Sequence, residues 1–310
     1  MNGLSIIVPF LNEGSEPYST IQSIYDTIDV VDFEIVALNE NPKDNYDFSK
    51  FPEVRYIKNN ERIGVDACRQ KGVELSRFSN CAIFDAHMRF KKDNWASKMI
   101  KYIEDNPQTL WCTTCIAIGW GTLDINNHKG KYFAANLRLF TEQEKDRPCR
   151  LIIEPTWAAE KPEKEYKVDC ILGANYFFLK DWFLHIGGLK GLKSWGTSEP
   201  FISIKSYLSG GDCRISKDIE IAHLFRDTAP YATPVSSLVY NKLYVLKTIF
   251  PKEMEDKLLR YIPQDKSYKK AIKWIEEDRD QIRQDRKNYE YIFRRDIYDY
   301  FREFDVKVPE

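Results

Sequence analysis

Asp85 and His87 are the residues whose types and spacing most directly suggest chemistry. They flank one residue at the end of the apolar segment 81–84, which the pattern predicts to be a buried strand. Because side chains alternate along a strand, both should point to the same side of the sheet. A carboxylate and an imidazole on one face can bind a divalent ion such as Mn²⁺, and the pair lacks the thiolates of structural zinc sites. Taken alone the spacing is weak evidence, since a strand-end Asp and His more often form hydrogen bonds within a loop.

The elements that would position this pair alternate between strand and helix. Apolar runs predict strands at 4–10, 33–38, 54–57 and 81–84, and apolar residues at helical spacing predict helices at 18–28 and 65–76. This order is typical of parallel strands in an α/β sheet, and each of these strands is followed by polar residues. Ligands of open α/β sheets bind at that carboxyl edge.

The rest of the chain divides into a continuation of this domain and a different C-terminal region. We expect a helix at 94–104, a strand at 110–118, irregular loops over 119–165, strands within 168–179, helices ending near Gly187 and Gly210, and a strand around His223. Beyond about residue 235 the pattern becomes long, charged and aromatic-rich helix. We therefore expect a catalytic domain over 1–235 and a helical extension over 236–310.

Composition excludes several classes of protein. The chain has 310 residues, 46 Lys and Arg against 47 Asp and Glu, and a hydrophobic fraction of 43%. These values are typical of a globular protein and exclude disordered, collagenous and coiled-coil chains. A net charge of −1 gives no overall attraction to nucleic acid or anionic lipid.

Cysteine usage and the N-terminal residues indicate a reducing compartment. Seven scattered cysteines follow a start that lacks a secretory signal, and the first apolar run, 4–10, is too short to span a bilayer. We therefore expect a cytoplasmic protein without a transmembrane segment. Cys112 and Cys115 form a C-x-x-C pair, but they lie in an apolar strand without a second pair, so we interpret them as core residues.

Seven ordered segments carry a resemblance to a known family. They include SIIVPFLNE, FDAHMRF, LGANYFFL and AHLFRDTAPY, and they occupy residues 5–13, 34–41, 54–76, 84–90, 172–179, 194–212 and 222–231. Together they resemble glycosyltransferases of GT-A fold, specifically the polypeptide N-acetylgalactosaminyltransferase-like group (glycosyltransferase family 27) and its family 2 relatives. The resemblance implies a three-layer α/β/α, Rossmann-like domain that transfers a sugar from a nucleotide-diphosphate sugar, UDP-linked in this group, to an acceptor hydroxyl.

The resemblance also implies roles for individual residues. The metal, Mn²⁺ in this reading, would be held by Asp85, His87 and His223. The donor site would comprise Pro9, Asn12 and Glu13 beneath the first strand, Asn39 and Glu40 at the base or ribose, Arg69 beside the strand-end acid and the donor, and Gly173 and Ala174 against the sugar. A divalent cation at this position would neutralise charge that develops on the departing nucleoside diphosphate.

Two departures from the group's pattern concern the donor and the reaction course. The group's paired acids after the second strand are Asn39 and Glu40 here, so the preferred base or donor could differ. The group's Trp-Gly-Gly-Glu is replaced by Trp195-Gly196-Thr197-Ser198, with Glu199 one place later. We expect Trp195 to stack on the sugar. We expect the helix dipole to keep the Glu199 carboxyl ionised, so that it can orient or deprotonate the acceptor hydroxyl. Both retention and inversion of the anomeric configuration stay open.

The acceptor is the least determined partner. It could be a hydroxyl on a polysaccharide, a protein or a modified DNA base, and a viral-type DNA glycosyltransferase acting on hydroxymethylated pyrimidines is the main alternative. The tail 266–304 interleaves cations with aromatic residues, which can bind nucleic acid, although packing on the catalytic domain is the simpler interpretation. Two further classes of function stay open: a nucleotide-sugar-binding protein without catalytic activity, and a structural interaction protein.

Overall fold

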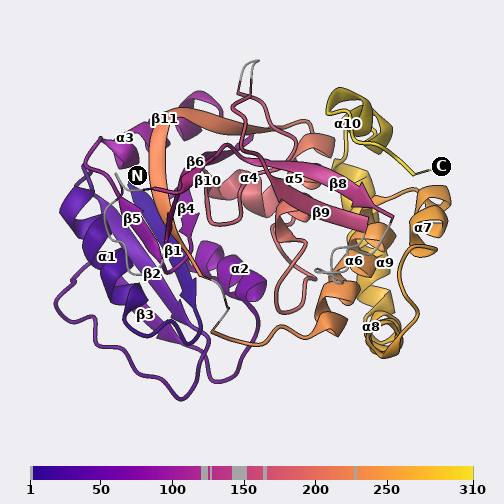
Figure 1. Cartoon of the computed structure of the whole chain (residues 1–310), viewed down its shortest axis with the longest axis horizontal. Coiled ribbons are helices and arrows are strands. Elements are labelled where there is room, and N and C mark those ends of the chain that lie inside the picture. The colour runs from indigo at the N-terminus through magenta and orange to yellow at the C-terminus, as the bar shows by residue number, and fades with distance from the viewer. Residues whose placement is uncertain are drawn as a thin grey trace.

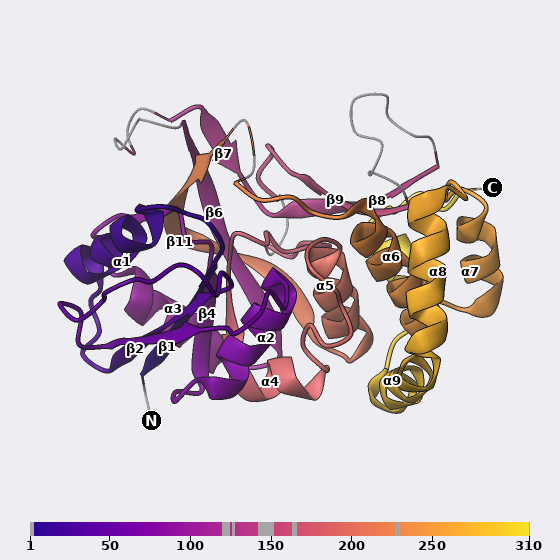
Figure 2. The same cartoon turned by 90° about the horizontal axis from the view of Figure 1, so that it is seen from below.

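A large mixed sheet organises the molecule. The computed structural model describes residues 3–119, 125, 128–141, 152–162, 166–226, 228 and 230–309. Eight strands pair in the order β3-β2-β1-β4-β10-β6-β11-β5 (Figure 1), and β7 is added to β6 as the ninth strand (Figure 2). The strands are β1 (Leu4–Phe10), β2 (Phe33–Asn39), β3 (Val54–Lys58), β4 (Asn80–Phe84), β5 (Met88–Phe90), β6 (Thr109–Gly119), β7 (Gly130–Tyr132), β10 (Asn175–Leu179) and β11 (Asp212–Phe225).

The N-terminal half of the sheet is parallel, as the sequence predicts. β1 pairs in parallel with β2 and with β4, and β2 pairs in parallel with β3. β10 then lies antiparallel between β4 and β6, whereas β11 runs parallel to β6 and antiparallel to β5. Through β11 the sheet brings residue 223 beside residue 88 in direct register, although the two are far apart in sequence.

Helices cover both faces of this sheet and complete three layers (Figure 2). Alternate residues of β1 face opposite sides: Ile6 belongs to a buried cluster with residues of α1 and α3, and Ile7 to a second cluster with residues of α2, α4 and α5. These helices are α1 (Glu16–Thr27), α2 (Val65–Leu75), α3 (Trp95–Asp105), α4 (Lys180–His185) and α5 (Ser198–Leu208). The α/β/α layering expected from the sequence is therefore present.

Part of the region expected to be irregular is a β-ribbon. β8 (Ala135–Phe140) and β9 (Ile152–Trp157) form an antiparallel pair apart from the main sheet, and β7 lies in the same region. The expectation of loops throughout 119–165 was wrong for these strands. Glycines and prolines suggested loops. However, Leu137 and Ile153 are buried in the core, and the two strands pair through hydrogen bonds between their backbone N–H and C=O groups. Residues 120–124, 126–127, 142–151 and 163–165 lie outside the described residues.

The C-terminal helices share a hydrophobic core with the sheet domain. α6 (Val235–Ile249) starts where the sequence pattern changes, and it is followed by α7 (Lys252–Leu259), α8 (Lys266–Glu277), α9 (Arg279–Ile292) and α10 (Ile297–Glu303). Tyr244 of α6, Ile275 of α8 and Tyr300 of α10 belong to the same buried cluster as Ile7 of β1. This arrangement agrees with the simpler interpretation of the tail, namely packing on the catalytic domain.

Cys112 and Cys115 are both buried in β6, and neither forms a disulfide. Burial raises the pKa of the Cys112 thiol to about 12, which disfavours the thiolate that redox or metal chemistry requires. Their interpretation as core residues agrees with this environment. Within the described part of the chain, no helix combines the length and the apolar character needed to cross a bilayer.

Candidate active site

A cavity of about 530 Å³ opens at the carboxyl edge of the sheet. Most of the residues singled out in the sequence line it: Pro9, Glu13, Glu40, Arg69, Asp85, His87, Gly173, Ala174, Trp195, Glu199 and His223. The residues come from β1, β2, α2, β4, β11 and the loops before β10 and α5. The fold thus gathers at one edge residues that are scattered through the sequence.

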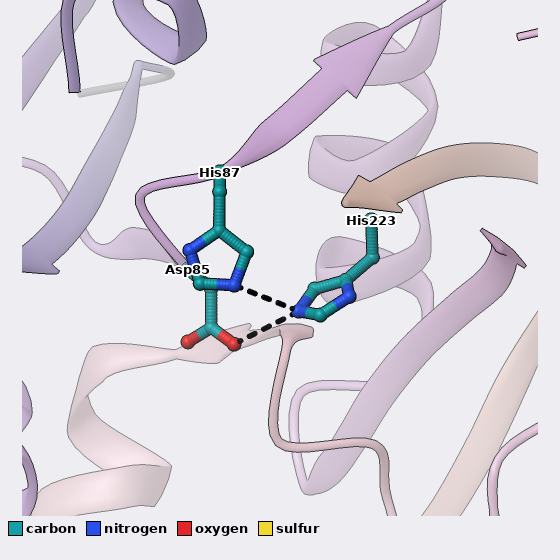
Figure 3. Close-up of side chains that lie close together, drawn as sticks. All are labelled: Asp85, His87 and His223. Carbon is teal, nitrogen blue, oxygen red and sulfur yellow. Dashed lines mark hydrogen bonds and ion pairs between the residues drawn. The ribbon is translucent and has the colours of Figure 1, made fainter. Parts of the chain in front are cut away.

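Asp85, His87 and His223 converge inside this cavity (Figure 3). Asp85 follows β4, where its backbone N–H donates to Ala174 O at 3.0 Å, and His87 precedes β5. His223 lies on β11, which is tied to the same turn because Leu224 N–H donates to His87 O at 3.0 Å. The His87 and His223 Nε2 atoms are 3.1 Å apart, and His223 Nε2 is 3.5 Å from Asp85 Oδ2.

This geometry fits a divalent cation. The three side chains offer ligand atoms that all lie within 4.8 Å of one another. Ligands about 2.1 Å from one ion are themselves about 3.0 to 3.5 Å apart in octahedral or tetrahedral geometry, and the observed separations of 3.1 and 3.5 Å match this spacing. A set of one oxygen and two imidazole nitrogens suits a borderline ion such as Mn²⁺ or Zn²⁺ better than Ca²⁺.

The charge states of this cluster also favour cation binding. Burial acts to raise the pKa of Asp85, but the hydrogen bond from His223 and the charge of Arg69 outweigh it, so the pKa lies well below its usual range. Burial lowers the pKa of His223 and so favours its neutral imidazole, whose Nε2 would bind a cation in place of the proton that it shares with Asp85. An ionised carboxylate and a neutral imidazole are the forms that bind a metal.

Glu13 contacts the His87 ring. Its Oε2 lies 3.3 Å from His87 Nδ1, on the side of the ring opposite to the Nε2 that faces His223, and the same carboxylate is paired with Arg226. Burial acts to raise the pKa of Glu13, but His87 and Arg226 outweigh it, so the carboxyl remains ionised. A carboxylate at Nδ1 favours the tautomer that leaves Nε2 free as a ligand atom.

Arg69 links the cluster to the sugar-facing side of the cavity. This almost fully buried guanidinium donates through Nη2 to Asp85 Oδ1 and to Gly173 O, each at 3.0 Å. Its Nη1 lies 3.4 Å from Asp66 Oδ1. A buried charge without partners would be costly, and these contacts provide the partners that stabilise Arg69 beside the strand-end acid.

Glu199 lies in the first turn of α5, half-buried against Gly173. We expected the helix dipole to keep its carboxyl ionised; burial instead raises the pKa of Glu199, although Arg69 opposes that shift. A raised pKa brings a carboxyl closer to the range in which it can accept a proton from a hydroxyl. Trp195 lies on the loop just before α5, is 44% exposed and lines the cavity.

Asn12 and Asn39 do not line the cavity. Asn39 is fully buried and bonded to Tyr56 Oη and to the backbone beyond β2, and Asn12 bonds to Asn41 at the surface. Glu40, the next residue after β2, does reach the cavity, where Arg62 Nε lies 3.7 Å from its carboxylate.

Several lining residues were not assigned a role from the sequence. They are Arg62, Glu154, Trp157, Phe225, Arg226, Tyr231 and Leu238. Four of them lie in or beside segments that carried the family resemblance: Arg62, Phe225, Arg226 and Tyr231. Glu154 and Trp157 are on the β9 strand, and Leu238 is on α6, so no local sequence signal placed them at this site.

A sheet of this order, covered on both faces and carrying its cavity at the carboxyl edge, has the GT-A fold. A solved structure titled GalNAc-T7 with UDP, GalNAc and Mn²⁺ superimposes with a TM-score of 0.65 at 16% identity, covering 98% of this chain and 57% of that one. A structure of S. aureus TarS in complex with UDP-GlcNAc gives a TM-score of 0.51 at 11% identity, covering 83% and 70% of the two chains.

Sequence comparison defines the family. Residues 5–159 match Glycosyl transferase family 2, and the chain belongs to this family. Human polypeptide N-acetylgalactosaminyltransferase 14 is 24% identical over 241 residues, which are 74% of this chain and 42% of that protein. Polypeptide N-acetylgalactosaminyltransferase 4 of Caenorhabditis elegans is 22% identical over 76% of this chain and 41% of its own length. The chain therefore spans under half the length of these relatives, and the resemblance deduced from the seven segments is confirmed.

Proposed function

We propose that this protein is a metal-dependent glycosyltransferase that moves a sugar from a nucleotide-diphosphate sugar, UDP-linked, to an acceptor hydroxyl. The observation that supports this most strongly is the convergence of Asp85, His87 and His223 in the cavity, with Arg69 beside them. A cation site and a buried guanidinium in one cavity at the edge of an α/β sheet suit a ligand that carries two phosphates.

The donor class is supported by the relatives. The GalNAc-T7 structure contains UDP, GalNAc and Mn²⁺, and the TarS structure contains UDP-GlcNAc. For this chain we propose UDP as the nucleotide and a hexose or N-acetylhexosamine as the sugar. At the nucleotide end, Glu40 and Arg62 provide a carboxylate and a guanidinium within the cavity.

Five residues would bind the cation or orient its ligands. Asp85, His87 and His223 would hold the cation, which when bound neutralises charge on the departing diphosphate. Glu13 would favour the His87 tautomer that presents Nε2, and Arg69 would orient Asp85.

Two residues would act on the sugar side. The exposed face of Trp195 would cover the sugar and exclude water. Glu199 would orient the acceptor hydroxyl or accept its proton, which is consistent with the raised pKa of its carboxyl.

The test is turnover of a donor panel. The purified chain is incubated with UDP-glucose, UDP-galactose, UDP-GlcNAc and UDP-GalNAc in Mn²⁺ or in EDTA, and released UDP is separated by chromatography. Three acceptor pools are added in parallel: oligosaccharides, Ser/Thr peptides and hydroxymethylated DNA. We expect UDP release with at least one donor in Mn²⁺ and none in EDTA. If no donor is hydrolysed or transferred and none raises the Tm, the chain is not an active glycosyltransferase.

A further inference from the structure

The loop that carries Trp195 has an intrinsically unfavourable backbone conformation. Ser194 and Thr197 adopt φ values of 59° and 67°, and Gly196 between them has φ 108°. A left-handed backbone at residues other than glycine is unfavourable and persists only where surrounding contacts impose it. The loop 193–197 therefore needs an external partner, and α6 supplies it.

Asn241 of α6 bonds this loop with its entire side chain. Its Oδ1 accepts from Lys193 N–H at 2.7 Å, and its Nδ2 donates to Lys193 O at 3.0 Å and to Gly196 O at 2.9 Å. Trp195 O is 3.4 Å from the same nitrogen. Asn241 is fully buried. Because the buried amide uses its acceptor and its donors to bond one loop, it stabilises the backbone conformation of that loop.

Two other contacts confine the loop. Leu238, one turn before Asn241 on α6, lies directly under Gly196, where a Cβ would approach its Cδ2 to 2.3 Å. On the opposite side Ser194 forms a parallel bridge with Gly64, the residue before α2, and a Cβ on Gly64 would approach Ser194 N to 2.6 Å. The loop is thus held between α6 and the start of the helix that carries Arg69.

The same face of α6 also fixes a second wall of the cavity. Lys242 is buried, donates to Ile153 O at 3.1 Å and pairs with Glu154. Glu154 belongs to β9 and lines the cavity. α6 is therefore joined to the cavity on two sides, although it belongs by sequence pattern to the helical extension.

We propose that Asn241 is a positioning residue, which holds the Trp195 loop in the conformation that presents the indole to the sugar in the cavity. This inference rests on the proposed function, because it assigns the loop to the sugar side of the same site. Asn241 itself does not line the cavity, so its effect on turnover passes through the loop. UDP alone carries no sugar, and its affinity should not depend on the loop.

The experiment measures Asn241→Ala by amide hydrogen exchange and by kinetics. We expect exchange at Lys193 N–H, which loses its acceptor, to accelerate by at least about tenfold. Turnover should fall by about 10- to 100-fold, because a shift of about 1 Å in a substrate-positioning group has effects of this size. The Kd for UDP in Mn²⁺ should stay within about twofold of the parent value.

A matched control is Thr248→Val, which removes the 2.8 Å hydrogen bond from Thr248 Oγ1 to Tyr244 O within α6, two turns beyond Asn241. It should lower stability and leave turnover and Lys193 exchange unchanged. In a Trp195→Ala background, Asn241→Ala should lower turnover little further, since both changes act through one loop. If Asn241→Ala does not fold, Asn241→Ser, which keeps one donor, takes its place.

The two proposals fail differently. Unchanged Lys193 exchange in the variant, or faster exchange with turnover at the parent level, overturns the role of Asn241. A parent protein that turns over no donor overturns the proposed function, whereas the exchange measurement still reports whether Asn241 holds the loop.

Discussion

Gly173→Ala is the substitution whose effect can be worked out most directly from the structure. A Cβ at this position would lie 2.0 Å from Glu199 Oε1 and 2.7 Å from its Cδ. Gly173 has no positive φ, so alanine fits its backbone and the side-chain collision is the main perturbation. Its carbonyl would still accept from Arg69. The substitution therefore tests the position of one carboxylate.

The size of the displacement sets the expected effect. Ordinary contact begins at 3.4 Å, so the Glu199 carboxylate must move by about 1.4 Å or adopt another rotamer. A misplacement of about 1 Å can cost about 10²-fold in rate when the group acts on the reacting atoms. We therefore expect kcat for sugar transfer to fall by about 10²-fold in Gly173→Ala, with the Kd for UDP little changed.

The assay is a double-mutant cycle with Glu199→Ala, which removes the carboxylate that collides. Steady-state transfer and UDP binding are measured for the parent, both single variants and the double variant. If the reasoning is correct, Gly173→Ala has almost no effect in the Glu199→Ala background. A kcat for Gly173→Ala within about twofold of the parent, or an equal loss in both backgrounds, would refute a reacting role for this carboxylate.

Four further predictions address separate parts of the molecule. His223→Ala should weaken Mn²⁺ binding, measured by electron paramagnetic resonance, by more than about 100-fold. The control His185→Ala changes an exposed histidine and should leave the Mn²⁺ affinity unchanged. Equal Mn²⁺ affinities of the two variants would refute the assignment of His223 as a metal ligand. Glu199→Gln should lower kcat by about 10²-fold at unchanged UDP affinity; a near-parent kcat would leave Glu199 as a helix-start residue worth about 0.3 to 1 kcal/mol. Burial raises the pKa of Asp169 to about 6, so its ionisation destabilises the fold as pH rises from about 4 to 6. The free energy of unfolding of the parent should fall relative to Asp169→Asn by about 2 kcal/mol over that range. A constant difference between the two free energies across this range argues against it. Tyr300→Ala should cost about 3 to 5 kcal/mol in chemical denaturation, because Tyr300 is fully buried and donates to Asp169 O at 2.6 Å; a loss below 1 kcal/mol would mean that α10 is not part of the core.

The local part of the fold could be predicted from sequence because its signals are local. The apolar run at 4–10 and the helical spacing around Ile21 and Ile24 coincide with β1 and α1. Asp85 and His87 could be paired because one strand end holds both. The link to His223 came from the family resemblance, since no pattern in the residues alone indicates that β11 pairs with β5.

The remaining features depend on contacts between distant segments. β8 and β9 pair with each other and stand apart from the main sheet, so their pairing could not be predicted from either segment alone. Asn241 is an ordinary polar residue in a helical pattern until the fold places it beside Lys193. The direction of the Glu199 pKa shift was expected from the helix dipole alone, whereas burial against Gly173 is a tertiary effect that outweighs it.

The metal dependence of UDP binding tests the central claim most directly. Calorimetric titration of the chain with UDP is carried out in Mn²⁺ and in EDTA, for the parent and for Asp85→Ala. The proposed site predicts that UDP binds the parent with a defined stoichiometry in Mn²⁺, and that EDTA and Asp85→Ala each abolish or greatly weaken this binding. UDP that binds equally well in EDTA, or equally well to Asp85→Ala, would contradict a metal-dependent nucleotide-sugar site at this cavity.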